Sequence, residues 1–227
     1  MDTKRIFEVI SIIKKSKYKA YLVGGSARDL LFARDFNDID IATNAPLNFL
    51  EKTFGVEDDS ARNMGSIKIN YKNVIMEITR FRKEIYDNKS IYPKIDKYLE
   101  SAEEDAIRRD FTINAIYIDI TNNEIIDPYD GIKDLFSFKI RFIGDPNVRI
   151  KEDPTRILRG IRLAYKMNFE MEESTKQAMI DNKQELARLS NNKYQKLINK
   201  MIEEFGERKV EMILETYQLG KESYEYK

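Results

Sequence analysis

Residues 21–43, YLVGGSARDLLFARDFNDIDIAT, constrain the fold more than any other stretch of the chain. They read as a short apolar strand, a Gly-Gly turn, the start of a helix, and two aspartates separated by one residue. Side chains two apart on a strand point to the same face, so Asp38 and Asp40 are predicted to lie side by side, with Ile39 and Ile41 facing the core. Two carboxylates that close repel each other unless a cation lies between them.

This stretch combines features that suit a metal and a phosphate. Mg²⁺ takes oxygen ligands and commonly binds one or two carboxylates together with substrate phosphates. Gly24 and Gly25 can adopt positive φ and let a backbone come close to a ligand, and a helix starting near Ser26 would point its free N–H groups at a phosphate. A Gly-Gly turn alone is most often only a turn, and a lone D-x-D strand is often a solvated edge. Their succession favours nucleotide chemistry.

Composition narrows the available chemistry. The chain has no cysteine and no histidine, which excludes Cys/His zinc sites, thiol nucleophiles and imidazole catalysis and leaves carboxylates and water. Its 39 basic and 39 acidic residues give a net charge of +0, so a nucleic-acid site is expected as a local patch. The sequence has no apolar run of transmembrane length and a polar start, which predicts a cytoplasmic chain without a membrane partner.

The apolar periodicity predicts an α+β chain. Helices are expected at residues 6–13, 27–33, 46–54 and 100–106, and strands at 21–23, 39–42, 66–71, 74–81, 116–120 and 124–126. Glu77 lies on the second strand of a predicted hairpin. If that strand lies beside the strand of Asp40, Glu77 supplies a third carboxylate; otherwise it is an exposed strand residue. Residues 82–98 are polar, lack a sustained period and are expected to form a functional loop.

Residues 108–115, RRDFTINA, set two arginines, an aspartate and an asparagine among apolar residues. Guanidinium groups bind phosphate oxygens through forked hydrogen bonds, and Asp or Asn can hold a ribose hydroxyl. The alternative is an Arg-Asp network that only stabilises a helix terminus.

Residues 152–162, EDPTRILRGIR, predict a helix that starts at Pro154 and is capped by Asp153. Asp153 and Arg156 would also present one acceptor and one donor together at that helix end. Cytosine and adenine each offer an amine beside an acceptor nitrogen on the Watson–Crick edge, and guanine and uracil offer the opposite order. The pair is therefore expected to select C and A. The basic stripe along this helix suits either a solvated face or an RNA path: Arg156, Arg159, Arg162 and Lys166.

The motif L-V-G-G-x-x-R-D-L-L followed by D-x-D resembles the signature of class II nucleotidyltransferases of the DNA polymerase β superfamily, which include CCA-adding enzymes and bacterial poly(A) polymerases. R-R-D-F-T-I-N-A and E-D-x-x-R resemble two further motifs of that family. The resemblance covers residues 21 to about 202. It implies a polymerase β-like head with a mixed sheet at residues 1–148 and an all-α neck at residues 149–227.

The resemblance implies addition of C and A from CTP and ATP to the 3′ end of tRNA, with Mg²⁺ as cofactor and pyrophosphate released. Asp38 and Asp40 are then the metal ligands, and Glu77 joins them in catalysis. Asp110 and Asn114 become ribose contacts, and Glu152 supports the base-selecting pair. The residues expected to bind the nucleotide are Gly24, Gly25, Arg28, Arg109, Asp110, Asn114, Glu152, Asp153, Arg156 and Arg159.

The chain departs from the family pattern in two places. The family's flexible loop carries Y-x-D-x-R-R-P, whereas here Tyr86, Asp87, Asn88 and Lys89 run on to a displaced Pro93, which makes addition of C alone or of A alone an alternative.

Family members also continue into a helical body and tail that grip tRNA, so the resemblance is to a short form without them. A poly(A) polymerase shares every motif. A catalytically silent RNA- or nucleotide-binding module is the alternative from another class.

Overall fold

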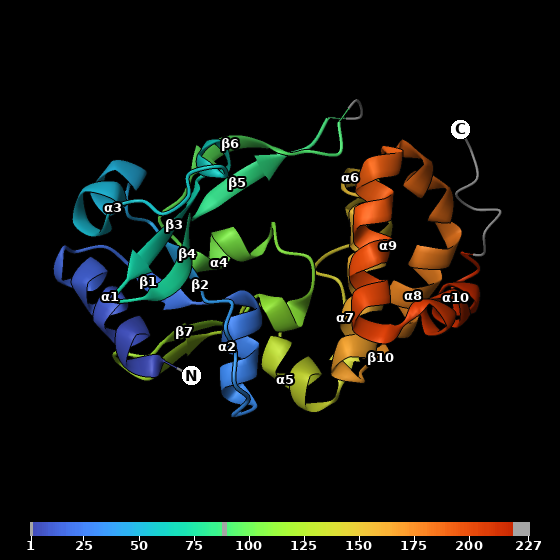
Figure 1. Ribbon diagram of the computed structural model, residues 1–227, viewed down its shortest axis with the longest axis horizontal. Coiled ribbons are helices and arrows are strands. Elements are labelled where there is room, and N and C mark those ends of the chain that lie inside the picture. The colour runs from blue at the N-terminus through green and yellow to red at the C-terminus, as the bar shows by residue number, and fades with distance from the viewer. Residues whose placement is uncertain (1, 88–89, 220–227) are drawn as a thin grey trace. The chain divides into compact units, whose positions relative to one another are not determined.

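The computed structural model describes residues 2–87 and 90–219. Its contacts divide the chain into two compact units (Figure 1): unit 1 is Met1–Ile85 with Lys94–Ile132, and unit 2 is Tyr86–Pro93 with Lys133–Lys227. The predicted division into head and neck after residue 148 stays a prediction. Across the described ranges, none of the helices has both the length and the apolar composition that a membrane span requires.

Unit 1 is built on a six-stranded mixed sheet with the strand order β3-β4-β2-β1-β7-β8. β2 and β4 run parallel, whereas β1 pairs antiparallel with both β2 and β7. The predicted mixed sheet is therefore confirmed. The strands are β1 Ala20–Leu22, β2 Asp40–Thr43, β3 Ser66–Tyr71, β4 Val74–Arg80, β7 Tyr117–Asp119 and β8 Glu124–Ile126.

Short helices of unit 1 pack against this sheet and connect its strands. α1 buries Ile6, Val9, Ile10 and Ile13, the residues whose spacing predicted an amphipathic helix. α3 ends at Gly55, whose positive φ terminates the helix as expected. The helical elements of unit 1 are α1 Thr3–Lys15, α2 Gly24–Leu31, α3 Leu47–Phe54, α4 Ala102–Ala106, and the 3₁₀ turns η1 Arg62–Met64 and η2 Thr112–Asn114, while α5 Gly131–Phe136 begins in unit 1 and continues into unit 2.

Residues 82–98 correct the prediction of a loop without regular structure. β5 Arg82–Ile85 pairs antiparallel with β6 Lys94–Tyr98 to form a separate two-stranded sheet. Most side chains of both strands are at least partly exposed, so the strands lack the alternation of apolar and polar residues by which a strand is detected in a sequence. Asn88 and Lys89, where the family's basic cluster would stand, lie outside the described residues.

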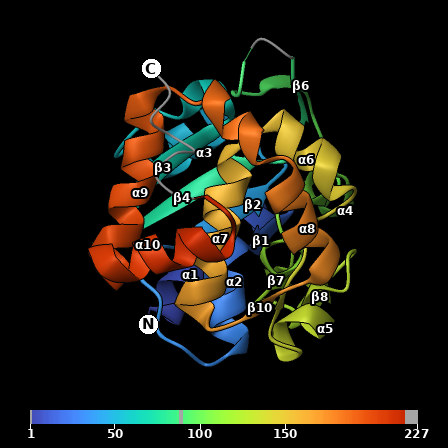
Figure 2. The same ribbon diagram turned by 90° about the vertical axis from the view of Figure 1, so that its right-hand side faces the viewer.

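Unit 2 consists mainly of helices, in agreement with the helical part that the family resemblance implies after the head (Figure 2). α7 packs against α6 and α9 and buries Ile157, Leu158, Ile161 and Ala164. A short parallel pair, β9 Lys139–Ile140 with β10 Glu170–Met171, also contacts α7. The helices are α6 Pro146–Glu152, α7 Thr155–Met167, α8 Glu173–Asp181, η3 Lys183–Arg188, α9 Asn191–Phe205 and α10 Glu207–Thr216. The last residues of the predicted helical part, 220–227, lie outside the described residues.

Candidate active site

Two carboxylates stand next to each other at the start of β2. Asp40 is the first residue of β2 and lies opposite Glu77 of β4 in the parallel register. Ile39 and Ile41 are 5% and 0% exposed, so burial of its neighbours determines the face on which Asp40 lies. The Asp40 N–H donates a hydrogen bond to the Ser26 hydroxyl at 3.2 Å, which ties α2 to the same point. The strand of Glu77 therefore lies beside the strand of Asp40, which is the condition stated for Glu77 as a third carboxylate.

The prediction that Asp38 shares this strand is wrong. β2 begins at Asp40, and Asp38 lies in the irregular segment before it with an exposed side chain. The last residue pair between β1 and β2 is Leu22 with Ile41. The pairing with β1 therefore does not extend to Asp38. Asp38 still lines a cavity of about 480 Å³ with Asp40 and Glu77.

The charge balance around Asp40 suits a cation. Burial of its carboxyl, followed by the negative charge of Glu77, raises the pKa of Asp40 to about 6, and Asp38 adds to this rise while Arg109 and Arg28 oppose it. The surrounding cations thus leave part of the negative charge uncompensated, and a divalent ion with oxygen ligands fits there. Within the described ranges, no three acidic side chains are already arranged as metal ligands. An ion held by Asp40 and its neighbouring acids would therefore complete its coordination with water and substrate.

The Gly-Gly turn holds one position that only glycine suits. Gly24 has a φ of +68°, and a Cβ added to it would lie 3.0 Å from Asp40 Oδ2. Of the two glycines that can adopt positive φ, only Gly24 does so. α2 begins at Gly24 rather than near Ser26, so Gly25 already has helical geometry and a single residue makes the turn.

Asp105 holds a cluster of guanidinium groups in unit 1. Its buried carboxylate accepts hydrogen bonds from Arg108 Nε at 2.8 Å and from the Tyr117 hydroxyl at 2.7 Å. The Tyr117 oxygen in turn accepts one from Arg109 Nε at 2.8 Å. Burial alone would raise the pKa of Asp105, but the charges of Arg108 and Arg109 hold it below its usual value. The arginines are therefore fixed by an ionised acid.

The acids and the arginines line the same cavity, of about 270 Å³. Asp40 and Glu77 contribute carboxylates to its lining, while Arg82, Arg108 and Arg109 contribute guanidinium groups. A cavity with both kinds of charge fits a ligand that brings cations and anions together, such as a phosphate chain with its metal.

The predicted ribose contacts lie beside this cavity rather than in its lining. Asn114 Oδ1 accepts a hydrogen bond from Arg28 Nη1 at 2.7 Å, so the structure brings these two predicted residues together. Arg28 is buried and its Nε also lies 3.2 Å from Asp29 Oδ1. Asp110 is half-buried. Ribose binding by Asp110 and Asn114 stays a prediction.

The pair predicted to select the base, Asp153 and Arg156, is buried in unit 2 and already bonded there. α7 begins at Thr155, and Asp153 Oδ1 accepts hydrogen bonds from the Thr155 N–H and hydroxyl, so Asp153 caps this helix. Asp153 Oδ2 accepts another from Arg159 at 2.8 Å. Arg156 is 1% exposed and donates from Nη1 to Glu152 Oε2 at 2.8 Å. These bonds agree with the capping interpretation of Asp153, and its role as a base contact stays a prediction.

Tyr86 engages the same guanidinium group and was missed by sequence reasoning. Arg156 Nη2 donates to its phenol oxygen at 3.0 Å, and the guanidinium carbon lies 5.2 Å from the centre of the ring. Tyr86 belongs to the segment that the resemblance identifies as the flexible loop. A base that binds Arg156 through Nη2 would have to replace this phenol.

The basic stripe of α7 is partly neutralised within unit 2. Arg162 forms an ion pair with Glu204 of α9, and Lys166 Nζ lies 3.8 Å from the same carboxylate. These contacts favour a helix-packing role for Arg162. They speak against an RNA path, which was one of the two alternatives that the sequence left open.

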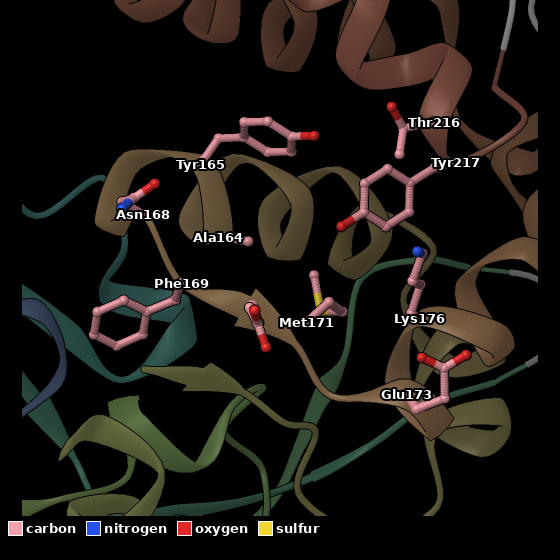
Figure 3. A pocket seen from close by; sticks show the side chains of 10 residues that line it. Ala164, Tyr165, Asn168, Phe169, Met171, Glu173, Lys176, Thr216 and Tyr217 are labelled. Carbon is pink, nitrogen blue, oxygen red and sulfur yellow. The ribbon is translucent and has the colours of Figure 1, made fainter. Parts of the chain in front are cut away.

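A separate cavity of about 360 Å³ lies at the C-terminal end of α7 (Figure 3). Tyr165, Met171, Lys176 and Tyr217 are among its lining residues, and the buried Tyr217 phenol points toward it. The residues predicted as site residues do not belong to its described lining.

Sequence reasoning also missed Arg82, Asp105 and Tyr117. One signal could have found Arg82, because it directly follows the predicted strand at residues 74–81 and so had to lie at an end of that strand. Asp105 and Tyr117 stand on different elements, α4 and β7, and no spacing in the sequence links them.

Known proteins similar to this chain are CCA-adding enzymes. The one from Bacillus pumilus (strain SAFR-032) is 34% identical over 209 residues, which are 92% of this chain and 52% of that protein. The one from Lactobacillus helveticus (strain DPC 4571) is 36% identical over 182 residues, which are 80% of this chain and 45% of that protein. The chain therefore spans about half the length of the curated relatives it matches.

Solved structures of such enzymes share the fold. The Bacillus stearothermophilus CCA-adding enzyme in complex with CTP has a TM-score of 0.85 and 29% identity, covering 96% of this chain and 53% of that one. A CCA-adding enzyme in complex with ATP has a TM-score of 0.77 and 25% identity, covering 96% and 51%.

The family model described as the poly A polymerase head domain matches residues 20–141. The match spans more than half of the 227 residues and includes Asp40, Glu77 and the arginine cluster around Asp105. With the six-stranded sheet and its paired carboxylates, this match shows that the chain belongs to the poly A polymerase head domain family.

Proposed function

We propose that this chain is an RNA nucleotidyltransferase that works without a nucleic-acid template and adds C and A from CTP and ATP to the 3′ end of tRNA. The observation that carries the proposal is the cavity in which Asp40 and Glu77 share a lining with Arg82, Arg108 and Arg109. The names of the relatives described above, CCA-adding enzymes, support the choice of tRNA as the substrate.

Mg²⁺ is the cofactor that fits this site. Asp40 and Asp38 would hold it with help from Glu77, because the negative charge there exceeds what Arg109 and Arg28 offset. When bound, it would lower the pKa of the attacking hydroxyl and neutralise charge on the triphosphate. Ser26 keeps the Asp40 backbone in place, and the Ser66 hydroxyl donates to Glu77 Oε1 at 2.7 Å, so both acids are positioned before substrate binds.

The two cavities that share Asp40 and Glu77 divide the substrates between them. The triphosphate occupies the cavity with the arginines, because only that one offers guanidinium groups to phosphate oxygens. The RNA end occupies the neighbouring cavity, where Lys68 supplies a positive charge and Ile75 an apolar surface beside the acids. The 3′ oxygen then bonds to the α-phosphorus, the bond to the β-phosphate oxygen breaks with its electron pair leaving on pyrophosphate, and the hydroxyl proton passes to water.

Base selection is assigned to Asp153 and Arg156 on unit 2. An acceptor and a donor side by side pair with the amine and ring nitrogen of C or A, whereas G and U would leave buried polar groups unpaired. Glu152 and Tyr86 hold Arg156, and Arg159 holds Asp153, so the pair is kept in defined positions until a base replaces some of these contacts.

A poly(A) polymerase is the second candidate, because the matching family model carries that description. It would extend unrelated RNAs with many A residues from ATP alone. Addition of C alone or of A alone is the third outcome, and the altered loop around Tyr86 is the reason to test it.

The test incubates the chain with Mg²⁺, each labelled triphosphate in turn, and tRNAs that end before the first C, after the first C or after the second C. CCA addition predicts incorporation of C, C and A, respectively. Asp38→Ala combined with Asp40→Ala should abolish incorporation, while the exposed Asp59→Ala serves as the matched control. Incorporation that survives the double substitution would refute the proposal and favour a silent binding module contaminated by another enzyme.

A further inference from the structure

Arg82 is a buried arginine with one unsatisfied nitrogen. It begins β5, is 8% exposed, and donates from Nε to Glu84 Oε1 at 2.8 Å, with Nη2 at 2.7 Å from the same oxygen. Its backbone N–H donates to Asp105 Oδ1 at 2.9 Å. Nη1, by contrast, is shielded from solvent and has no hydrogen-bond partner among the residues that the structure describes.

A buried N–H donor without a hydrogen-bond partner, such as Arg82 Nη1, requires an explanation. A buried donor left unpaired is destabilising, more so for a charged group, and native structures keep few of them. A guanidinium offers five N–H donors in a fixed fork, so a side chain whose Nε and Nη2 already bond Glu84 presents its remaining edge in a defined direction. Arg82 lines the cavity that contains Asp40 and Glu77. The cavity is thus the place from which a partner for Nη1 would come.

The charges nearby show which kind of partner is missing. Arg82, Arg108 and Arg109 share two acids, Asp105 and Glu84. Burial and then the charge of Arg108 lower the pKa of Arg82, so the neighbouring guanidinium groups repel each other. An anion would remove that repulsion and satisfy Nη1 at once.

Arg82 and Arg109 line the same cavity but differ in the charged groups that act on them. Arg109 is the cation that acts most strongly on Asp40, whereas the strongest charge effects on Arg82 come from Arg108, Glu84 and Asp105. A phosphate chain with its reacting phosphorus beside Asp40 would therefore meet Arg109 first and Arg82 farther along.

We propose that Arg82 binds the outer phosphates of the incoming triphosphate, the part that leaves as pyrophosphate. This assignment rests on the proposed function, and neither the motifs nor the family resemblance pointed to Arg82. When the bond between the α-phosphorus and the bridging oxygen breaks, its electron pair adds negative charge to the pyrophosphate, and Arg82 stabilises that charge through Nη1.

The test measures binding directly, by calorimetry at one fixed Mg²⁺ concentration, with CTP, CMP and inorganic pyrophosphate as separate probes. R82Q should weaken binding of CTP and pyrophosphate about 10- to 100-fold and leave CMP within twofold, because CMP lacks the outer phosphates. R82K, which keeps the charge without the forked donors, should fall between R82Q and the unchanged chain. K83Q is the matched control: Lys83 is the next residue on β5, its side chain is 56% exposed, and the charge change is the same.

The outcomes separate this proposal from the proposed function. Unchanged affinity of R82Q for CTP and pyrophosphate would overturn the role of Arg82, and so would an equal loss for CMP, which points to a structural effect. If R82Q does not fold, as judged by thermal melting, R82K decides by the same criteria. If the unchanged chain binds pyrophosphate through Arg82 and yet extends no RNA, the proposed function fails while the phosphate site stands.

Discussion

Replacing Asp40 by asparagine should stabilise the metal-free chain at neutral pH. Burial and the neighbouring charge of Glu77 raise the pKa of Asp40 from its usual 3.8 to about 6 in the folded chain. The folded state therefore holds the Asp40 proton more tightly than the unfolded state does. The resulting stabilisation is complete below pH 3.8, is lost as the pH rises through 6, and leaves an ionised Asp40 as a net cost above that pH.

The size of this cost follows from the pKa. One pKa unit corresponds to about 1.4 kcal/mol, so the stability lost relative to a pH well below 3.8 is roughly 1 kcal/mol at pH 4.5, where only the unfolded state has released the proton, and roughly 3 kcal/mol at pH 7.5, where Asp40 is ionised in both states. Asparagine cannot ionise and has nearly the same shape. The gain in unfolding free energy of Asp40→Asn over the unchanged chain should therefore grow by about 2 kcal/mol between these two pH values.

Urea denaturation in the presence of EDTA measures this difference. Asp38→Asn is the control, because Asp38 is exposed outside the strand and its replacement should change stability by no more than about 0.5 kcal/mol at either pH. Adding Mg²⁺ should stabilise the unchanged chain more than Asp40→Asn, since the ion binds the folded acid. A gain that is equal at both pH values, or a loss at pH 7.5, would refute the charge balance derived for this site.

Three further substitutions test single contacts. Gly24→Ala should lower the unfolding free energy by about 1–2 kcal/mol and displace Asp40 Oδ2, because φ is +68° there; wild-type melting and incorporation would contradict this. Tyr117→Phe removes the hydroxyl that joins Arg109 to Asp105 and should cost about 1–3 kcal/mol in a denaturant titration, and a cost below 0.5 kcal/mol would speak against a linked cluster. Tyr86→Phe should tighten CTP binding about fivefold, because a base no longer competes with the phenol for Arg156; weaker binding in a titration would show that Tyr86 supports the base site instead.

Local patterns were sufficient for most of the elements of this chain. The spacing of Ile6, Val9, Ile10 and Ile13 predicted α1, and the strands at residues 66–71 and 74–81 were predicted with a turn at Lys72 and Asn73, which have positive φ as such a turn requires. Patterns failed where the chain obeys no period. The two strands of the hairpin β5–β6 are mostly exposed, and the strand expected around Asp38 begins only at Asp40.

By itself the sequence determined the types of chemical group available and the face on which each lies. Without cysteine or histidine, carboxylates and arginines were the remaining candidates, and the burial of Ile39 and Ile41 directs Asp40 away from the core. Tertiary structure alone decided which of these groups meet. Glu77 faces Asp40 because β2 and β4 pair in parallel, and the Tyr117 hydroxyl of β7 reaches the Asp105 carboxylate of α4. Periodicity describes neighbours along one element, whereas such contacts depend on how distant elements pair, and short-range patterns do not encode that pairing.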